Sequence, residues 1–268
     1  MEAYTEARRR FTGLGEPGMV AVSWHQTGRA HQEAGDYEAA EDAYRQALAI
    51  EVRLGDVAGQ ASTLGQLGIL YADALGRTEE AVAFLRQSAE KSIEIGDQAG
   101  EGRRRSNLAD SLRKLRRLDE ARQEIRRAIR CKSGFSHASA PWKSWAILAG
   151  IETDAGDLKA AAEAGNQARQ AYLAYRRAGG ENHDPAGRIA FNVTQLLLAG
   201  QAAEAASLLQ ELATDPGFAW LTWFIQALQA IVAGSRDRRL ADAPDLHYTM
   251  AAEILILLET LEKAGQSS

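Results

Sequence analysis

Apolar and small residues recur along the chain at the spacing of helices. Within 23–50 the sequence follows W-x3-G-x2-aromatic in its first half and A-x3-Y-x2-A in its second half. Residues three and four apart share one face of a helix, so each half predicts a helix. Gly35 and Asp36 separate the halves, because glycine tolerates the left-handed conformation that ends a helix. The segment predicts an antiparallel pair, helix A followed by helix B.

The turn between pairs repeats along the chain. LGEPG at 14–18 returns as LGDVAG at 54–59 and as IGDQAG at 95–100. Gly15 and Gly55 lie 40 residues apart, and Gly55 and Gly96 lie 41 apart. Self-similarity at such a period indicates a stacked repeat array, in which each unit contacts its neighbours.

One position of helix A is always small. Gly28, Gly68, Ala109 and Ala149 follow one another at intervals of 40, 41 and 40 residues. A small side chain there lets helix A approach helix B closely. A weaker fifth pair carries Ile189, Val193, Leu196, Ala205 and Leu209.

The motif of the first pair resembles the tetratricopeptide repeat. The longer units and their G-D/E-x-x-G turns resemble the subclass found in kinesin light chains, GoLoco-containing spindle regulators and bacterial signalling proteins. The resemblance covers 1–213 and implies an all-α fold, a right-handed α-solenoid of helix-turn-helix repeats. It also implies protein binding without naming a partner, because this fold serves many unrelated partners.

Three regions follow from the pattern. We expect 1–20 to form an orphan helix B or an N-terminal cap, which suggests either a fragment of a longer protein or a native cap. We expect about five repeats in 21–213. We interpret 214–268 as a degenerate sixth pair that caps the array, because terminal units of solenoids are often atypical. Alternatively, its apolar face covers a dimer partner or a further domain.

Composition excludes several classes of protein. The 268 residues contain one cysteine, Cys131, which excludes a disulfide framework and fits a reducing compartment. No apolar run is long enough for a membrane span, and the N-terminus does not resemble a signal peptide. We therefore expect a cytoplasmic protein without membrane contact.

No catalytic motif stands out. The histidines form no HExxH or HxxxH pattern, and the sequence has no phosphate-binding loop or nucleophile elbow. The turn aspartates Asp36, Asp56, Asp97 and Asp157 each follow a glycine, so we expect them to cap the next helix. We predict no enzyme activity, no metal and no cofactor.

Helix A residues that point away from helix B line the concave groove in this family. By that resemblance the groove positions are Val22, His25, Arg29, Gln32 and Glu33; Ser62, Gly65, Ile69, Ala72 and Asp73; Arg103, Ser106, Asp110, Arg113 and Lys114; and Lys143, Ala146, Gly150, Thr153 and Asp154.

A row of carboxamides precedes the small helix A position. It consists of Gln26, Gln66 and Asn107, with Asn192 as the candidate in the fifth pair. In the kinesin-light-chain-like subclass, an Asn here resembles one that holds the main chain of an extended peptide. An amide suits this task because it donates and accepts at once. The alternative is that these amides bond neighbouring helices of the array.

Charge is distributed unevenly. The net charge is −5, yet 101–132 holds 12 Arg or Lys against 5 Asp or Glu. Arg122, Arg126 and Arg130 recur on one face of a helix B, which indicates a solvated outer surface. Arg103, Arg113 and Lys114 fall at groove positions, and arginine suits carboxylates.

We predict a scaffold that binds a protein or peptide, with an acidic segment preferred at the basic groove positions. The alternative for these cations is a solvated or inter-domain basic face. Nucleic acid is disfavoured, because the flanking repeats are acidic and repel phosphate. The second hypothesis for the whole chain is a sensor or oligomerisation module of a bacterial regulatory protein, in which the C-terminal helices form a homo-oligomer.

Overall fold

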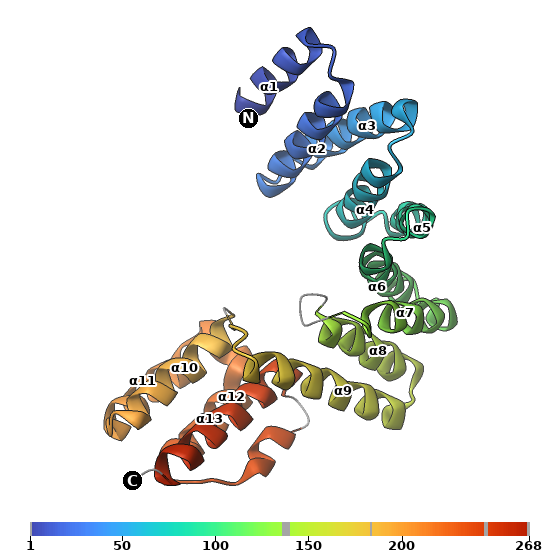
Figure 1. Cartoon of the computed structure of the whole chain (residues 1–268). Coiled ribbons are helices and arrows are strands. Elements are labelled where there is room, and N and C mark those ends of the chain that lie inside the picture. The colour runs from blue at the N-terminus through green and yellow to red at the C-terminus, as the bar shows by residue number, and fades with distance from the viewer. Residues whose placement is uncertain (1, 136–139, 183, 244–245, 267–268) are drawn as a thin grey trace. The chain divides into compact units, whose positions relative to one another are not determined.

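The computed structural model describes residues 2–135, 140–182, 184–243 and 246–266 (Figure 1). Within these ranges the chain is built of helices and contains no strand, which confirms the predicted all-α solenoid. It forms two compact units, Met1–Ala161 and Ala162–Ser268, which are described separately below.

The first unit contains an initial helix and the predicted helix pairs. Helix α1 packs on α2, where the guanidinium of Arg8 lies 3.7 Å from the ring centroid of Trp24. Figure 1 shows the A helices α2, α4, α6 and α8 along one side of this unit and the B helices along the other. The helices are α1 (Glu2–Gly13), α2 (Pro17–Glu33), α3 (Tyr37–Leu54), α4 (Val57–Asp73), α5 (Thr78–Glu94), α6 (Gln98–Lys114), α7 (Leu118–Lys132) and α8 (Pro141–Ala155).

The repeated turn ends one helix and begins the next. Gly55 and Gly96 have positive φ angles of 67° and 70°, the left-handed conformation expected of them. The following aspartates cap the next helix, since Asp56 accepts from the Gly59 N–H at 2.9 Å and Asp97 from that of Gly100 at 2.8 Å. Asp36 and Asp157 accept equivalent bonds, which confirms the predicted capping role.

The small helix A position is where paired helices come closest. A Cβ atom added to Gly28 would lie 2.7 Å from the ring of Tyr44, and one added to Gly68 would lie 2.5 Å from Cγ of Leu85. Tyr44 and Leu85 are fully buried, so neither can move aside easily. The two glycines therefore set the spacing between helices A and B.

Polar contacts join each helix B to the helix A of the next repeat. Glu51 of α3 meets Thr63 of α4, and Lys132 of α7 meets Ser144 of α8 at the equivalent positions. In the intervening contact Arg104 of α6 donates to Ser88 of α5 at 2.9 Å. We call these three contacts the inter-repeat seams, and each places a charged group in a largely buried setting.

The second unit is built around one apolar core. It contains most of α9 (Leu158–Arg177), followed by α10 (Pro185–Leu198), α11 (Ala202–Thr214), η2 (Pro216–Leu221), α12 (Thr222–Val232), η3 (Arg238–Asp242) and α13 (Tyr248–Gln266). Val193 and Leu209 of the predicted fifth pair share that core with Phe224, Ile254 and Leu258. The fifth pair therefore folds with the C-terminal helices, whereas a repeat region at 21–213 with a separate cap at 214–268 stays a prediction.

A close-contact variant tests the helix spacing. We expect Gly68→Ala to lower the free energy of unfolding by about 1–3 kcal/mol, because the added methyl group overpacks against buried Leu85. The matched control is Gly165→Ala in α9, where nothing lies within 4 Å of the new Cβ, and it should raise stability by about 0.5–1 kcal/mol. Urea unfolding followed by circular dichroism measures both. Equal changes in the free energy of unfolding for the two substitutions would contradict the claim that Gly68 sets the spacing between helices A and B.

Candidate functional site

A hollow of about 360 Å³ lies on the face formed by the A helices of the first unit. Three successive A helices, α4, α6 and α8, supply most of its lining. Ile69, Ala72 and Ile147 make part of it apolar, while Asn107 and Lys114 bring polar groups to it. This surface therefore combines an apolar recess with polar groups in the region that the sequence assigns to the groove.

The carboxamide row is not used to join helices. Gln26, Gln66 and Asn107 are each partly exposed. Within the described ranges, no residue forms a hydrogen bond with any of these three side-chain amides, although the hollow adjoins Asn107. The alternative that they bond neighbouring helices has no support among these residues, so their donors and acceptors stay available to a ligand.

Two expected anchors are already engaged by carboxylates. Arg113 Nε donates to Asp154 Oδ2 at 2.6 Å, and Lys114 Nζ lies 2.9 Å from Asp73 Oδ1 and 3.3 Å from Asp110 Oδ2. The hydrogen bond from Arg113 lowers the pKa of Asp154 below its ordinary value, and the bond to Asp73 raises that of Lys114. A carboxylate ligand would have to displace these internal partners.

Several other arginines of the basic segment are compensated in the same way. Arg117 pairs with Glu79 and Glu120, and Arg122 pairs with Glu152, a residue that is almost fully buried. Most of these partners belong to the neighbouring repeats. The local excess of positive charge is therefore largely an inter-repeat ion-pair system rather than an open basic face.

Arg116 also contacts the next repeat, although it has a strained backbone conformation. It has a φ of 61° at the turn position that Gly35, Gly76 and Gly156 occupy in other repeats. A left-handed conformation costs a non-glycine residue about 1–2 kcal/mol. Its guanidinium donates to the main-chain oxygen of Asp154 at 3.1 Å and lies 3.3 Å from that residue's Oδ1. The contact with the next repeat offsets part of that strain.

Arg103 and Lys143 differ from the groove cations Arg29, Arg113 and Lys114, which form ion pairs. Arg103 and Lys143 occupy equivalent positions on α6 and α8, both are exposed, and neither forms an ion pair with any residue in the described ranges. Ser106 and Ser144, close to them in sequence, have hydroxyl oxygens 2.9 Å apart, which holds the two helices together at this point. Arg103 and Lys143 together form an uncompensated basic step on the A-helix face.

Lys132 lies beneath the basic step. Its side chain is 4% exposed, and its ammonium donates to Ser106 at 3.2 Å and to Ser144 at 2.9 Å. Burial, assisted by the charges of Lys143 and Arg103, lowers its pKa to about 8. Since hydroxyls only partly replace the lost hydration, the buried charge opposes folding near neutral pH.

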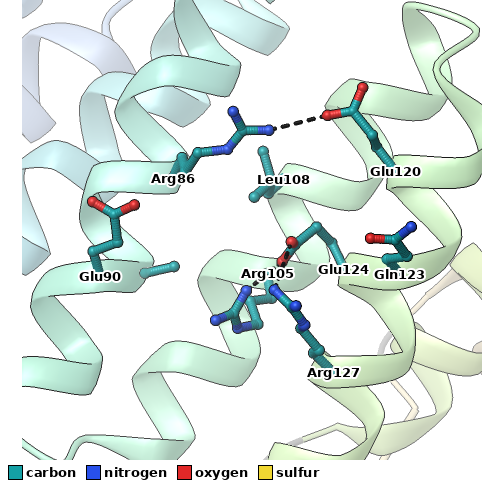
Figure 2. Close-up of a pocket in the computed structure, with 9 residues that line it drawn as sticks. Arg86, Glu90, Arg105, Leu108, Glu120, Gln123, Glu124 and Arg127 are labelled. Carbon is teal, nitrogen blue, oxygen red and sulfur yellow. Dashed lines mark hydrogen bonds and ion pairs between the residues drawn. The ribbon is translucent and has the colours of Figure 1, made fainter.

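The opposite surface contains a second hollow, of about 380 Å³, between α5 and α7. Figure 2 shows Arg86 reaching across it to Glu120, at 3.2 Å, and Arg105 directed at Glu124. Arg127 also pairs with Glu124 at 3.2 Å. Because its charges are largely satisfied by one another, this outer hollow offers a ligand less than the A-helix face does.

Of the remaining predicted site residues, Arg29 and Asn192 do not line the hollow, whereas Asp110 does. Arg29 forms an ion pair with Glu33 at 3.6 Å, and Asp110 faces Lys114 within the hollow's lining. Asn192 belongs to the second unit and is exposed on α10. No cluster of three metal-ligating side chains occurs in the part of the chain that the structure describes. In the same residues no helix is long and apolar enough to span a membrane.

Comparison with known proteins identifies the repeat. Residues 19–94, from α2 to the end of α5, match the family model of the tetratricopeptide repeat. Residues 19–94 therefore contain tetratricopeptide repeats. Proteins with these repeats generally bind other proteins. No curated protein matches the sequence.

Among solved structures, the fold is similar to the crystal structure of BtubC (BKLC) from P. vanneervenii. The TM-score is 0.59 and the sequence identity 18%, over 100% of this chain and 89% of that chain. At this identity the similarity shows the fold alone, the tetratricopeptide-type helical array.

The buried ammonium group of Lys132 should make the stability of the protein depend on pH. We expect Lys132→Met to stabilise the tetratricopeptide array at pH 7 by up to about 3 kcal/mol, because it removes a buried charge while Ser106 and Ser144 keep their mutual bond. Between pH 8 and about 10.5 the unfolded wild-type chain binds more protons than the folded one, so wild-type stability rises with pH. The advantage of the variant should shrink over that window. A pH-independent difference in urea unfolding would contradict the lowered pKa of Lys132.

Proposed function

We propose that the A-helix face of the first unit binds an extended segment of a partner protein. The observation that carries the proposal is the carboxamide row, whose three side chains are uncommitted within the described chain and one of which, Asn107, lines a recess. The activity is binding rather than catalysis. We assign it to the cytoplasm, which suits the buried free thiol of Cys131.

Main-chain recognition suits the row's regular spacing. Gln26, Gln66 and Asn107 occupy one position on successive A helices. An extended peptide presents N–H and C=O groups that water otherwise satisfies, and each amide can replace water at both. Main-chain bonds contribute affinity whatever the partner's sequence. Specificity must therefore come from contacts with the partner's side chains.

Two features supply that specificity. The recess beside Asn107 and Ile147 accepts an apolar side chain of the partner. Arg103 and Lys143, which have no internal carboxylate partner among the described residues, attract a carboxylate. Along α6, Arg103 and Asn107 are separated by about 6 Å at 1.5 Å per residue. We therefore propose that the partner carries an acidic residue close to the apolar one.

The amide contact is tested with a peptide selected against the full chain from a displayed random library. We expect Asn107→Ala to weaken its binding about tenfold, because the peptide main chain loses a partner on becoming buried. Gln87→Ala, an exposed amide on helix B of the second repeat, is the matched control and should leave affinity unchanged. Fluorescence anisotropy measures both. Equal affinities for the wild type and both variants would reject the amide row as the site.

The basic step is tested separately. We expect the double variant Arg103→Glu, Lys143→Glu to weaken the same peptide about tenfold or more at low salt, with a smaller effect at high salt because ions screen exposed charges. Arg130→Glu changes an exposed cation on α7 and serves as the control. Affinity that depends on Asn107 but not on the basic step would retain the groove and reject the acidic partner.

The second candidate is assembly through the second unit. Trp220 and Trp223 are 59% and 54% exposed, whereas Leu257 is buried in the core. Exposed tryptophans are favoured at interfaces. We expect a concentration-dependent dimer in sedimentation that Trp223→Glu abolishes without changing the circular dichroism spectrum. A monomer at every concentration would remove this candidate.

A further inference from the structure

Three residues form a continuous polar chain across the first inter-repeat seam. Oγ1 of Thr63 on α4 lies 2.9 Å from Oε1 of Glu51 on α3 and 2.9 Å from Nδ1 of His25 on α2. Glu51 is 4% exposed, Thr63 is fully buried and His25 is partly exposed. These hydrogen bonds therefore connect a partly exposed imidazole to a buried carboxyl group.

The carboxyl group is poorly compensated. Oε2 of Glu51 has no hydrogen-bond partner in the described structure, and no cation there forms an ion pair with the carboxylate. The nearby groups are Asp56, which caps α4, and Arg29 and Tyr44, which act on His25 through charge and ring contact. Burial raises the pKa of Glu51 to about 7, opposed by the Thr63 bond and assisted by Asp56. Burial lowers the pKa of His25, so its imidazole stays neutral near pH 7.

Two arrangements of protons satisfy both hydrogen bonds of Thr63. With Glu51 ionised, Thr63 donates to Oε1 and accepts from Nδ1–H of His25, which leaves Nε2 as an acceptor. With Glu51 protonated on Oε1, that O–H donates to Thr63, Thr63 donates to Nδ1, and Nε2 carries the proton. Because Oε2 has no partner, a proton on Oε1 gains a hydrogen bond that a proton on Oε2 would lack.

We propose that Glu51, Thr63 and His25 form a proton relay in which ionisation of the buried carboxyl group sets the tautomer of the imidazole. A proton that binds Nε2 displaces the Nδ1 proton onto Thr63, whose own proton passes to Glu51. One proton enters, no bond between heavy atoms changes, and His25 ends neutral with its second nitrogen converted from acceptor to donor.

The equivalent positions in the array show which part is specific to this seam. Lys132, Ser144 and Ser106 each lie 81 residues after Glu51, Thr63 and His25, and they form the same continuous contact, with Lys132 Nζ 2.9 Å from Ser144 and the two serines 2.9 Å apart. A polar link at this position is thus a recurring seam feature. Only the first seam joins a carboxyl group to an imidazole, the pair that can transmit a proton near neutral pH.

The relay has a consequence for recognition that rests on the proposed function. His25 falls at a groove position of the first repeat, one residue before Gln26. A partner carbonyl at Nε2 would favour protonated Glu51, and a partner N–H would favour the ionised form. Binding of a given segment should therefore change with pH around 7 through the relay as well as through exposed charges.

The direct test follows the His25 imidazole by long-range ¹H–¹⁵N correlation NMR on the full chain without a ligand, from pH 6 to 9. We expect Nε2–H at the acid end and Nδ1–H at the alkaline end, with the same midpoint, about 7, as the carboxyl ¹³C shift of Glu51. A single tautomer throughout, or an imidazolium signature at that midpoint, would overturn the relay. Because no ligand is present, the result is independent of the proposed function.

Two substitutions at Thr63 supply the matched comparison. Thr63→Ser keeps the hydroxyl and should keep the shared midpoint, whereas Thr63→Val removes it and should leave the His25 tautomer insensitive to the carboxyl titration. Glu51→Gln should abolish the midpoint near 7. If the tautomer still followed pH in the Glu51→Gln protein, a different group would control it and the relay would be rejected.

Discussion

The close approach of helices A and B is the contact on which the array depends. Gly28 and Gly68 face side chains that a Cβ atom would strike, and Ala109 and Ala149 keep the same position small in the next two repeats. This contact fixes the unit that is stacked. Once the unit is fixed, residues at equivalent positions lie in rows on successive A helices. A row of amides or cations then forms one continuous surface that a ligand can contact.

Stacking of the repeats also determines which charged side chains stay unpaired and can bind a ligand. In the third repeat half of the arginines pair with carboxylates of neighbouring repeats, so the basic segment is partly neutralised by its acidic flanks. On the A-helix face, Arg103 and Lys143 form no ion pair within the described ranges, and the side-chain amides of the row form no hydrogen bond there. The candidate site is therefore defined by what stacking leaves unsatisfied, more than by local charge.

The repeat pattern predicted much of the fold, because glycine turns, aspartate caps and helical spacing are local signals. The pairing of Lys114 with Asp73 and of Arg113 with Asp154 was not foreseen, because each contact spans 41 residues and depends on side-chain direction between repeats. Arg116 shows the same limit, since its sequence carries no sign of a glycine-like backbone. The buried Glu51 and Lys132 were missed because charged residues on a helix B ordinarily indicate solvent.

The most direct measurement is a ¹⁵N NMR titration of the full chain with a library-selected peptide, following side-chain amide resonances. The account predicts that the resonances of Gln26, Gln66 and Asn107 shift together and saturate at one affinity, while those of Gln46, Gln87 and Gln123 on the B helices stay in place. Shifts confined to the B-helix amides, or to the second unit, would contradict a binding surface on the A helices.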